Sequence, residues 1–567
     1  MRFGIRLSCF RPWMALPVLV GMLAAPAPAR GEESSVEPSA PATGDESAAR
    51  PSTPAEAGRS VADPPPVELP PPCGPGVRGC YLARDGRYRS VDATYATSLV
   101  PPKAHYLIAA VEDLTFVAIG AVWYMVALDD NKVDWDIESV RQRFSRESVR
   151  FDSNTFTMNF LLHPLSGSAY YAFPRANGLN VGVSATYAFL SSMLWEFGLE
   201  FNEKLSINDV IATPLGGMGL GEFFFRLGKY LNSAPGGGDT WHRVLGCSLG
   251  VVQCAHDRAA DHRRGSAPGT VVDSLGFDAA IAHAFAIRSL FGAARVDEGS
   301  SFFRYEVSVD ADLVAMPGYL RPGAFGRFYA DGNFTRFRVR GLGGPSGNGT
   351  FLDSDAVLFG YYAQDVRGEG RPRGWGLSVG SSVGYTYRRD DHEDFHDRWC
   401  LTHFPGLALD LTVLRPRLAM HTRLRGYGDF AGVHSMAFDA WRDANPGVIT
   451  KPVLEREGYY YAWGGSLRFD LDFEMPWVLV GGSVFAGKYR SQDGLDRHQE
   501  EIDAMGVDVH ASDGILELEA HLRLYPFRRL PISVEIGGAR YLRSSRAGGY
   551  TAHASFDRLG AGLGVRF

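Results

Sequence analysis

The sequence predicts an α+β protein, with an N-terminal helical domain followed by a C-terminal antiparallel transmembrane β-barrel of about twelve strands. Three observations favour this fold class. Apolar residues recur at every second position in the C-terminal half, the connections between these stretches alternate between short and long, and the chain ends on the aromatic residue Phe567. Because a barrel strand is apolar on one face only, its average hydropathy is close to neutral, which agrees with the mean hydropathy of −0.11.

The size and charge of the chain restrict its class further. A chain of 567 residues is too long for a single hydrophobic core, so we expect more than one domain. The formal net charge of −7 is accompanied by no strongly basic patch. We therefore expect no nucleic-acid partner.

The N-terminal region has the order of a secretory signal peptide. Arginines come first, an apolar stretch follows, and small residues over 25–29 offer cleavage sites. We predict a cleaved signal peptide over residues 1–29, with a membrane anchor as the alternative. Residues 30–72 are rich in Pro, Ser, Ala and Glu and contain no aromatic residue, which predicts a disordered linker. After the linker we expect a helical domain of unknown function over residues 73–265. The barrel is expected over residues 266–567.

Two pairs of cysteines have the same spacing, Cys73 with Cys80 and Cys247 with Cys254. In an oxidising compartment such pairs are candidate disulfides that close small loops. Free thiols are the alternative that the sequence leaves open.

The first apolar segment of the helical domain, residues 106–128, is interrupted by Glu112 and Asp113. We expect a buried or interfacial helix there, with a transmembrane helix as the alternative, because a long uninterrupted apolar segment would stop the chain at the inner membrane. A second helix is predicted over 163–173 and is expected to end at Pro174.

Two further helices are predicted, one over 178–201 and one that begins after Ser206. Ser206 and Asp209, three positions apart, have the pattern of a capping box. The last helix carries small residues at every fourth position, namely Thr213, Gly217 and Gly221. Small residues on one face allow two helix backbones to approach closely.

The hydrophobic period changes to two from about residue 270. In the final strand the outward residues are Leu559, Ala561, Leu563, Val565 and Phe567. Short Pro-bearing turns at 316–317, 371–372, 415–416, 475–476 and 525–526 alternate with longer loops expected near 289–301, 341–352, 390–401, 429–457, 491–509 and 544–551. Tight periplasmic turns and long outer loops are typical of outer-membrane barrels. Asp331-Gly332 inside the third strand could instead form a hairpin turn and change the strand count.

Residues expected to face the barrel lumen carry charges of both signs. The positive ones are Arg423, Arg425, Arg468, Arg523, Arg558 and Arg566, and the negative ones are Glu306, Asp310, Asp312, Asp470, Asp472, Glu517 and Glu519. In a narrow barrel we expect these charges to pair across the lumen, which argues against a wide, open pore.

The densest group of functional residue types lies in the helical domain. His163, Glu196 and Asp209 are candidate catalytic residues, because carboxylates beside a histidine can orient it and support proton transfer or metal ligation. The candidate ligand-binding residues near them are Tyr170, Tyr171, Arg175, Trp195, Glu200, Asn208, Thr213 and Glu222. The alternative is a structural network of buried, satisfied polar groups.

No standard enzyme motif accompanies these residues, and the sequence predicts neither a cofactor nor a metal site. The segment 390–397, rich in Asp and His, could bind a divalent cation, but we expect a solvated charged loop there.

The stretch from Asn159 to Glu222 resembles the uncharacterised bacterial family catalogued as domain of unknown function 3943. The resemblance rests on His163-Pro164, Gly167, Tyr170-Tyr171, Trp195-Glu196, Ser206, Asn208-Asp209, Thr213 and Gly217. It covers the helical region and not the barrel. The resemblance implies an envelope protein and lends no established activity.

These observations predict a protein of a Gram-negative outer membrane, with the helical domain in the periplasm or against the membrane. The expected partners are outer-membrane lipid and, through Phe567, the outer-membrane insertion machinery; the oligomeric state stays open. The leading hypothesis is a non-enzymatic role in envelope organisation or in passage of a small or lipidic molecule. The rival hypothesis is an enzyme acting on envelope lipid or glycan, with His163 as base or ligand and Glu196 and Asp209 as its orienting partners. A channel is the third hypothesis, and the mixed lumen charges argue against it.

Overall fold

The computed structural model describes residues 73–98, 103–127, 149–259 and 271–567, apart from gaps at 153, 200–204, 235–237, 346, 393–394, 451, 493–506 and 528–529. The chain divides into two units, Met1–Pro72 and Cys73–Phe567, and the described residues all belong to the second. The predicted signal peptide, the predicted linker and Glu200 lie outside the described residues.

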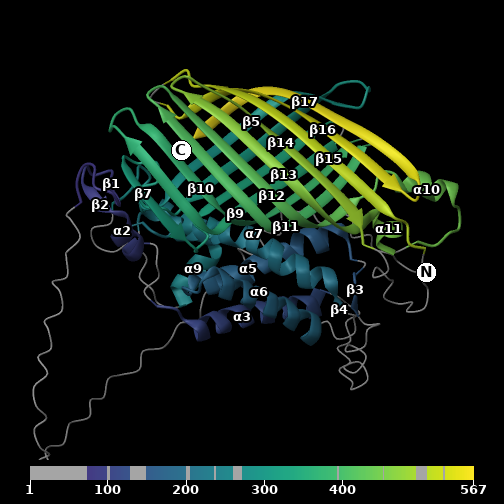
Figure 1. Ribbon diagram of the computed structural model, residues 1–567. Coiled ribbons are helices and arrows are strands. Elements are labelled where there is room, and N and C mark those ends of the chain that lie inside the picture. Colours follow the sequence, from purple (N-terminus) through teal and green to yellow (C-terminus); the bar gives the residue numbers. More distant parts are fainter. Residues whose placement is uncertain are drawn as a thin grey trace, which may run out of the picture. The chain divides into compact units, whose positions relative to one another are not determined.

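The main feature of the second unit is a closed antiparallel β-barrel (Figure 1). Its strands are β5 (Ala282–Val296), β6 (Phe302–Val314), β7 (Gly323–Tyr329), β8 (Phe334–Gly344), β9 (Gly347–Arg367), β10 (Arg373–His392), β11 (Phe395–Arg415), β12 (Leu418–His434), β13 (Tyr459–Met475), β14 (Val478–Ser491), β15 (Ala511–Leu524), β16 (Ile532–Ala547) and β17 (Tyr550–Arg566). Pairing of β17 with β5 closes the wall. The wall has twelve strand positions, because β7 and β8 share one position beside β9. This confirms the predicted number of about twelve strands.

The third strand of the wall is broken into β7 and β8. Both run antiparallel to β9, with β7 beside residues 360–366 of that strand and β8 beside residues 347–357. Asp331 and Gly332 lie in the break, where Gly332 adopts a φ of 61°. The chain keeps its direction through the break, so the hairpin turn considered at Asp331-Gly332 is absent and the strand count is unchanged.

The outer wall is apolar. Exposed apolar residues on it include Phe291, Val484, Leu518, Ile536, Leu559 and Leu563. We call the end of the barrel that carries the Pro-bearing turns the turn end, and the opposite end the loop end. Exposed aromatic residues lie near both ends, namely Trp375, Trp477 and Phe567 at the turn end and Phe303, Tyr305 and Tyr550 at the loop end. An apolar band between two aromatic girdles is the arrangement of an outer-membrane β-barrel.

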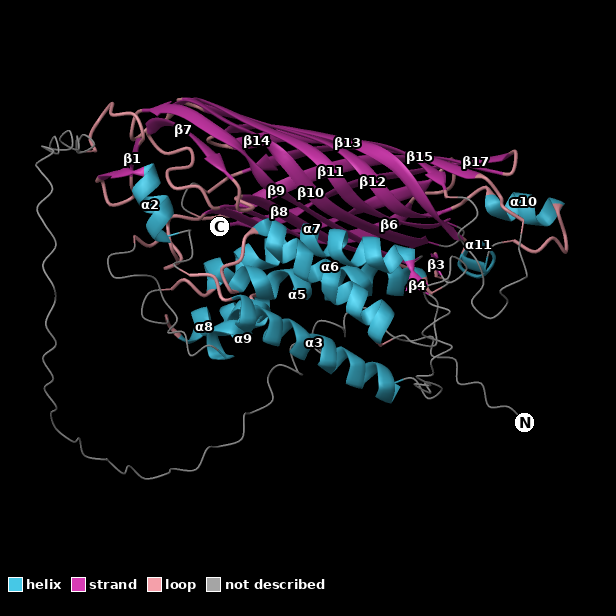
Figure 2. Cartoon of the chain, turned by 60° about the horizontal axis from the view of Figure 1, so that its bottom comes forward, coloured by secondary structure: helices cyan, strands magenta, loops and turns pink. Residues whose placement is uncertain are grey.

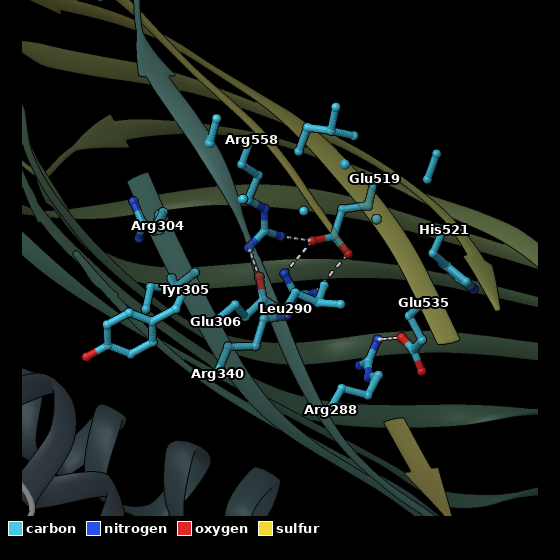
Figure 3. A pocket seen from close by; sticks show the side chains of 18 residues that line it. Arg288, Leu290, Arg304, Tyr305, Glu306, Arg340, Glu519, His521, Glu535 and Arg558 are labelled. Carbon is cyan, nitrogen blue, oxygen red and sulfur yellow. Dashed lines mark hydrogen bonds and ion pairs between the residues drawn. The ribbon is translucent and has the colours of Figure 1, made fainter. Parts of the chain in front are cut away.

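Charged side chains fill the lumen and pair across it, as predicted (Figure 3). Glu519 of β15 accepts hydrogen bonds from Arg340 of β8 at 2.8 Å and from Arg558 of β17 at 2.5 Å. Further pairs between strands that are not neighbours are Arg336 with Asp470, Arg423 with Asp312, Arg425 with Asp355, and Arg468 with Asp353. The cavity beside Glu519 has a volume of about 70 Å³. Ion pairs therefore cross the lumen between strands that are not neighbours.

The strands extend farther towards the loop end than the sequence predicts. The expected loop over 390–401 is wrong, because β10 and β11 run through most of it. Asp390 accepts hydrogen bonds from Arg304 Nη2 at 3.0 Å and from Arg388 Nε at 2.6 Å, so charges that suggested a solvated loop are paired inside the barrel. Within the part of the chain that the structure describes, no group of three or more His, Cys, Asp or Glu side chains could hold a metal ion.

The helical domain begins at the turn end with β1 (Cys80–Leu82), β2 (Tyr88–Ser90) and α2 (Val91–Ser98). The longer helices are α3 (Tyr106–Ala127), α5 (His163–Ala176), α6 (Val181–Gly198) and α7 (Ile207–Leu231), and the π-helix η3 (Met158–Leu162) leads directly into α5. The short elements are β3 (Val149–Arg150), β4 (Leu205–Ser206), α8 (Thr240–Leu249) and α9 (Val251–Ala259), with α10 (Phe438–Ala444) and α11 (Pro452–Glu457) in a loop-end connection of the barrel. Disulfides join Cys73 to Cys80 and Cys247 to Cys254, and the described free cysteine Cys400 is buried.

The predicted helices are present, with some ends displaced, since the helix predicted over 178–201 is α6, Val181–Gly198. Pro174 does not end α5, which continues to Ala176, because a proline in the last turn removes one hydrogen bond without reversing the chain. The predicted start of α7 is confirmed, since the Asp209 N–H donates to Ser206 Oγ at 3.3 Å. The start of α7 thus follows from local capping.

The helices lie beside the barrel as a layer along one side of its wall (Figures 1 and 2). Within this layer α7 contacts β8, β9, β10 and β11, whereas α5 and α6 pack on α7 and α3 packs on α5 and α6. Side-chain alternation shows that α7 lies on the outer surface. Phe337 of β8 stacks on Phe223 of α7 with ring centroids 4.7 Å apart, whereas its neighbours Arg336 and Arg338 bond acidic residues in the lumen.

Helix α7 follows the height of the barrel. At its C-terminal end, Tyr230 donates to Asp273 at 2.7 Å and lies 3.1 Å from His283, at the turn-end start of β5. At its N-terminal end, Asn208 bonds Asp152, which also bonds Tyr461 at the loop-end start of β13. The helix therefore spans from the turn end to the loop end.

Candidate functional site

Two glycines of α7 bring its backbone against the barrel wall. A Cβ on Gly219 would lie 2.7 Å from the Gly384 carbonyl carbon of β10, and a Cβ on Gly216 would lie 3.2 Å from a ring carbon of Tyr385. Ser354 of β9 donates to the Gly219 carbonyl at 2.7 Å. This contact is close because neither glycine carries a side chain, and it fixes the position of α7 along the wall.

The small residues predicted to bring two helices together do so between α5 and α7. A Cβ on Gly167 would lie 1.9 Å from the Thr213 carbonyl oxygen, and a Cβ on Gly217 would lie 2.4 Å from the Gly167 carbonyl carbon. Gly221 packs in the same way against Ser168. Thr213, a candidate ligand residue, is 3% exposed and belongs to this helix contact.

Five residues form what we call the interface charge cluster, namely Tyr171, Arg175, Glu222, Arg226 and Asp331. Arg175 Nε lies 2.8 Å from Glu222 Oε2, and the Tyr171 hydroxyl donates to the same oxygen at 2.7 Å. Arg226 Nε lies 2.9 Å from Glu222 Oε1. Both arginines also pair with Asp331, in the break between β7 and β8, at 2.8 and 3.3 Å.

The interface charge cluster connects the helices to the barrel rather than leaving an open site. Arg175, Glu222 and Arg226 are each at most 3% exposed. Arg175 Nη2 donates to the Asp331 carbonyl at 3.0 Å, and Arg226 Nε lies 3.1 Å from the Gly332 carbonyl oxygen. The break in the third strand therefore frees two backbone carbonyls that accept hydrogen bonds from the helical layer.

A second polar group ties the layer to the loop end of the barrel. Asn159 Nδ2 lies 2.5 Å from Asp152 Oδ1, 2.7 Å from the Tyr461 hydroxyl and 3.0 Å from the Tyr459 hydroxyl. The Asp152 N–H donates to Asn208 Oδ1 at 2.9 Å, which places the candidate residue Asn208 in the same network. Tyr459 and Tyr461 point outwards, on the same side of β13 as the exposed Leu467.

The structure brings His163 and Asp209 together at the start of α7. His163 Nε2 lies 3.6 Å from Asp209 Oδ1, and the His163 side chain is 16% exposed against 2% for Asp209. Glu196 joins them through the helix cap, because its Oε2 accepts the Ser206 N–H at 2.9 Å while Ser206 Oγ accepts the Asp209 N–H. Ser192 Oγ donates to the Asp209 carbonyl at 3.0 Å. We call these five residues the histidine cluster.

Two other candidate ligand residues hold α3. Tyr170 of α5 packs edge-on against Phe116 with ring centroids 5.6 Å apart, and Trp195 of α6 packs edge-on against Tyr124 at 5.9 Å. Their rings are occupied by contacts with another helix.

The two clusters differ in what they can do chemically. In the interface charge cluster, two arginines and two carboxylates form ion pairs in a buried setting, which suits an anchor. In the histidine cluster, a partly exposed imidazole lies beside a buried carboxylate, an arrangement that can accept a proton from a molecule on the exposed side.

Sequence reasoning missed five residues of these networks, namely Asp152, Arg226, Asp331, Tyr459 and Tyr461. Arg226 follows Glu222 by one helical turn, and this spacing is a signal for an ion pair on one helix face. Tyr459 and Tyr461 carry hydroxyls at outward positions of a barrel strand, where apolar side chains are expected. Asp331 also gave a visible sign, as a polar interruption of a strand.

Comparison with known proteins adds little to the barrel assignment. This chain is similar to OmpT, an outer membrane protein of Vibrio cholerae, with 7% identity and a TM-score of 0.20, over 53% of this chain and 100% of that chain. It is similar to the outer membrane channel DcaP of Acinetobacter baumannii, with 8% identity and a TM-score of 0.20, over 53% of this chain and 99% of that chain. It is also similar to the β domain of the Bordetella autotransporter BrkA, with 11% identity and a TM-score of 0.18, over 50% of this chain and 100% of that chain. TM-scores this low carry no argument, so the assignment rests on the strand pairing and the apolar wall. No curated protein matches the chain.

A family model matches the part of the chain that contains both clusters. The match runs over residues 148–250, from the start of β3 to the end of α8, and it includes the histidine cluster and the helical members of the interface charge cluster. This agrees with the resemblance drawn from the sequence. Residues 148–250 therefore match the family described as Domain of unknown function (DUF3943).

Proposed function

We propose that the protein is an outer-membrane scaffold, in which a barrel that does not conduct holds a helical layer against its outer wall and so contributes to envelope organisation. The observation that carries the proposal is the interface charge cluster, in which buried charges of α5 and α7 meet Asp331 in a break of the barrel strand. A helical domain that was only linked to the barrel through the chain would not need buried ion pairs with the barrel wall.

The filled lumen supports a non-conducting barrel. Ion pairs such as Arg340–Glu519 and Arg336–Asp470 join opposite sides of the wall and occupy the space that an aqueous path would need. Of the two placements predicted for the helical domain, the contact along the wall supports the membrane-apposed one. Phe567 supports recognition by the insertion machinery, because its side chain is exposed on the outer wall while its backbone pairs with Phe285.

The location is tested by heat-modifiable gel mobility in the outer-membrane fraction, and the closed lumen by planar-bilayer recordings of the full chain. We expect a folded, heat-modifiable species that gives no stepwise conductance. Stepwise conductance, or protein found only as soluble periplasmic material, would contradict the proposal.

The role in envelope organisation is tested in a deletion strain through the barrier against a large apolar dye. We expect dye entry to rise on deletion and to be suppressed by the full chain but not by Glu222→Gln. Asp439→Asn, which removes an exposed charge on α10, serves as the matched control and should suppress entry as the full chain does.

A second candidate function, an enzyme acting on envelope lipid or glycan, is favoured by one observation, the partly exposed His163 beside the buried Asp209. In this case His163 acts as the base and Asp209 orients its ring. The test is the lipid and glycan profile of the deletion strain complemented with the full chain, with His163→Gln, or with the control His396→Gln at an exposed His–Asp pair. A profile restored equally by all three would exclude this function.

A further inference from the structure

We propose that α3, α5, α6 and α7 cross the outer membrane beside the barrel, so that the hydrocarbon core of the bilayer covers the exposed faces of α3 and α6. This inference rests on the proposed outer-membrane location of the barrel. It goes beyond that proposal by placing a helical bundle in lipid, in a membrane that the barrel crosses with strands.

The exposed face of α3 is apolar over residues 106–124, whose side chains the structure describes. Its exposed large apolar residues are Tyr106, Leu107, Ile108, Val111, Leu114, Ile119, Val122 and Trp123. The Thr115 hydroxyl on this face donates to the Val111 carbonyl at 2.6 Å and so needs no water. No described side chain exposed on α3 carries a charge. This pattern is typical of a helix whose outer face contacts lipid.

The exposed face of α6 has the same character. Phe189, Leu190 and Leu194 are exposed, and the Thr186 hydroxyl donates to the Gly182 carbonyl at 3.1 Å. The only charged residue of α6, Glu196, is 1% exposed. The two helices therefore present apolar outer faces on the side of the layer away from the barrel.

The two acidic residues that interrupt the apolar sequence of α3 face the bundle interior. Asp113 is 2% exposed and accepts a hydrogen bond from Ser191 of α6 at 2.6 Å. Glu112 accepts from Asn177 Nδ2 at 2.5 Å and lies 3.0 Å from His256 Nδ1. Acidic residues within membrane helices face the interior and pair there, as these do. They also make α3 less apolar than a segment that would halt export at the inner membrane.

The lengths of the helices match a bilayer. At 1.5 Å per residue, the 22 residues of α3 span about 33 Å, against about 30 Å for the hydrocarbon core. Tyr106 near one end and Trp123 near the other lie where aromatic residues of membrane helices are enriched. Tyr106–Tyr124 is the one stretch, among the described helices, long and apolar enough to cross a membrane by composition alone.

The position of the layer supplies the strongest argument. Helix α7 is fixed along the wall from the loop end to the turn end, at the height of the apolar band. If that band lies in the membrane, a layer packed beside it lies in the membrane too. The less apolar helices α5 and α7 carry Arg175, Glu222 and Arg226 of the interface charge cluster, and they are shielded by the barrel on one side and by α3 and α6 on the other.

The chain order is consistent with four crossings. Helix α3 starts at the turn end, where the His105 N–H donates to the Asn177 carbonyl after α5, and α3 reaches Trp195 near the far end of α6. Helices α5 and α7 begin side by side, with His163 3.6 Å from Asp209, and α6 runs back to this end, where Glu196 accepts the Ser206 N–H. An even number of crossings returns the chain to the turn end, where β5 begins.

The test uses single-cysteine variants of the full chain, spin-labelled in reconstituted outer-membrane lipid vesicles, with collision rates measured for oxygen and for a water-soluble nickel chelate. The test sites are Val111 and Val122 on α3, which are 56% and 61% exposed. Leu559 on β17 (64% exposed) is the lipid-facing barrel control, and Asp439 on α10 is the aqueous control. The unsubstituted chain, whose described free thiol is buried, supplies the background.

We expect Val111 and Val122 to resemble Leu559, with oxygen collisions several-fold favoured over nickel collisions. If both α3 sites resemble Asp439 while Leu559 stays in lipid, the helical layer is outside the bilayer and the inference is overturned, although the outer-membrane barrel stands. If Leu559 is aqueous as well, the barrel is not in a membrane and both proposals fail.

Discussion

Arg175 and Glu222 form a bidentate ion pair between α5 and α7, with Nε 2.8 Å from Oε2 and Nη2 3.1 Å from Oε1, and both side chains are buried. Arg226 and Asp331 complete the set, so two positive charges face two negative ones. Because Asp331 belongs to the barrel, charge balance in the helical layer depends on contact with the wall.

Removing the charge of Glu222 should therefore weaken both the contact between α5 and α7 and the contact of these helices with the barrel. Glu222→Gln leaves two buried guanidinium groups with one carboxylate between them, and breaking a buried pair costs about 3–5 kcal/mol. The measurement is urea unfolding of the folded protein in lipid vesicles. The control Asp439→Asn, which breaks the exposed pair with Arg442, should change stability by about 0–1 kcal/mol. Equal effects of the two substitutions would show that the buried cluster is no anchor.

The close approach of α5 and α7 gives a second prediction. Gly217→Ala would place a methyl group 2.4 Å from the Gly167 carbonyl carbon, in contact with backbone that has no room to move. Overpacking of this kind costs about 1–3 kcal/mol, and the unfolding midpoint should fall accordingly. Gly182→Ala on the exposed face of α6 is the matched control, because its nearest contact would be 3.5 Å away. A Gly217→Ala protein as stable as the control would contradict the packing.

The filled lumen gives a third prediction. Replacing Arg340, Glu519 and Arg558 together by serine removes three long side chains around the existing cavity of about 70 Å³ while keeping the net loss of charge small. We expect this variant to show stepwise conductance in planar bilayers and the natural chain to remain silent. The double variant Arg295→Ser/Asp557→Ser, which removes a more exposed pair, should remain silent too. Silence of the triple variant would show that something other than these ion pairs closes the lumen.

The exposed face of α3 gives a fourth prediction. Leu114 lies near the middle of this helix and is 52% exposed, so Leu114→Lys would place an ammonium group in hydrocarbon at a cost of about 3 kcal/mol. The expected result is a several-fold loss of the folded, heat-modifiable species from the outer-membrane fraction. Ile449→Lys, at a residue that is 71% exposed in a loop-end connection, should be tolerated. Equal yields of the two variants would place α3 in water.

Local patterns account for most of what could be predicted of the fold. Alternation along each strand depends only on the pleat, so the barrel, its strand number and the lumen charges follow from the sequence. The start of α7 follows from Ser206 and Asp209, because capping is a contact between residues three apart. Loop boundaries were less predictable, since Asp390 looks solvated in the sequence and is paired inside the barrel.

The position of the helical layer could not be predicted, because it depends on contacts between distant parts of the chain. Arg175 meets Asp331 across a sequence separation of 156 residues, and Asn159 meets Tyr461 across 302. The candidate residues predicted as one site lie in two separate groups, because their positions also depend on contacts between distant parts of the chain. His163 and Asp209 lie side by side, whereas Tyr171, Arg175 and Glu222 satisfy one another and a barrel residue.

The central claim, that the helical layer is held against the outer wall of the barrel, is tested most directly by photo-crosslinking in intact cells. A benzophenone amino acid replaces Phe337, which stacks on Phe223 of α7, and in a matched variant it replaces Leu563 on the uncovered side of the wall. We predict that the Phe337 position crosslinks to a peptide from residues 207–231 and that the Leu563 position does not. Absence of that peptide from the Phe337 crosslinks of a correctly folded barrel would contradict the account.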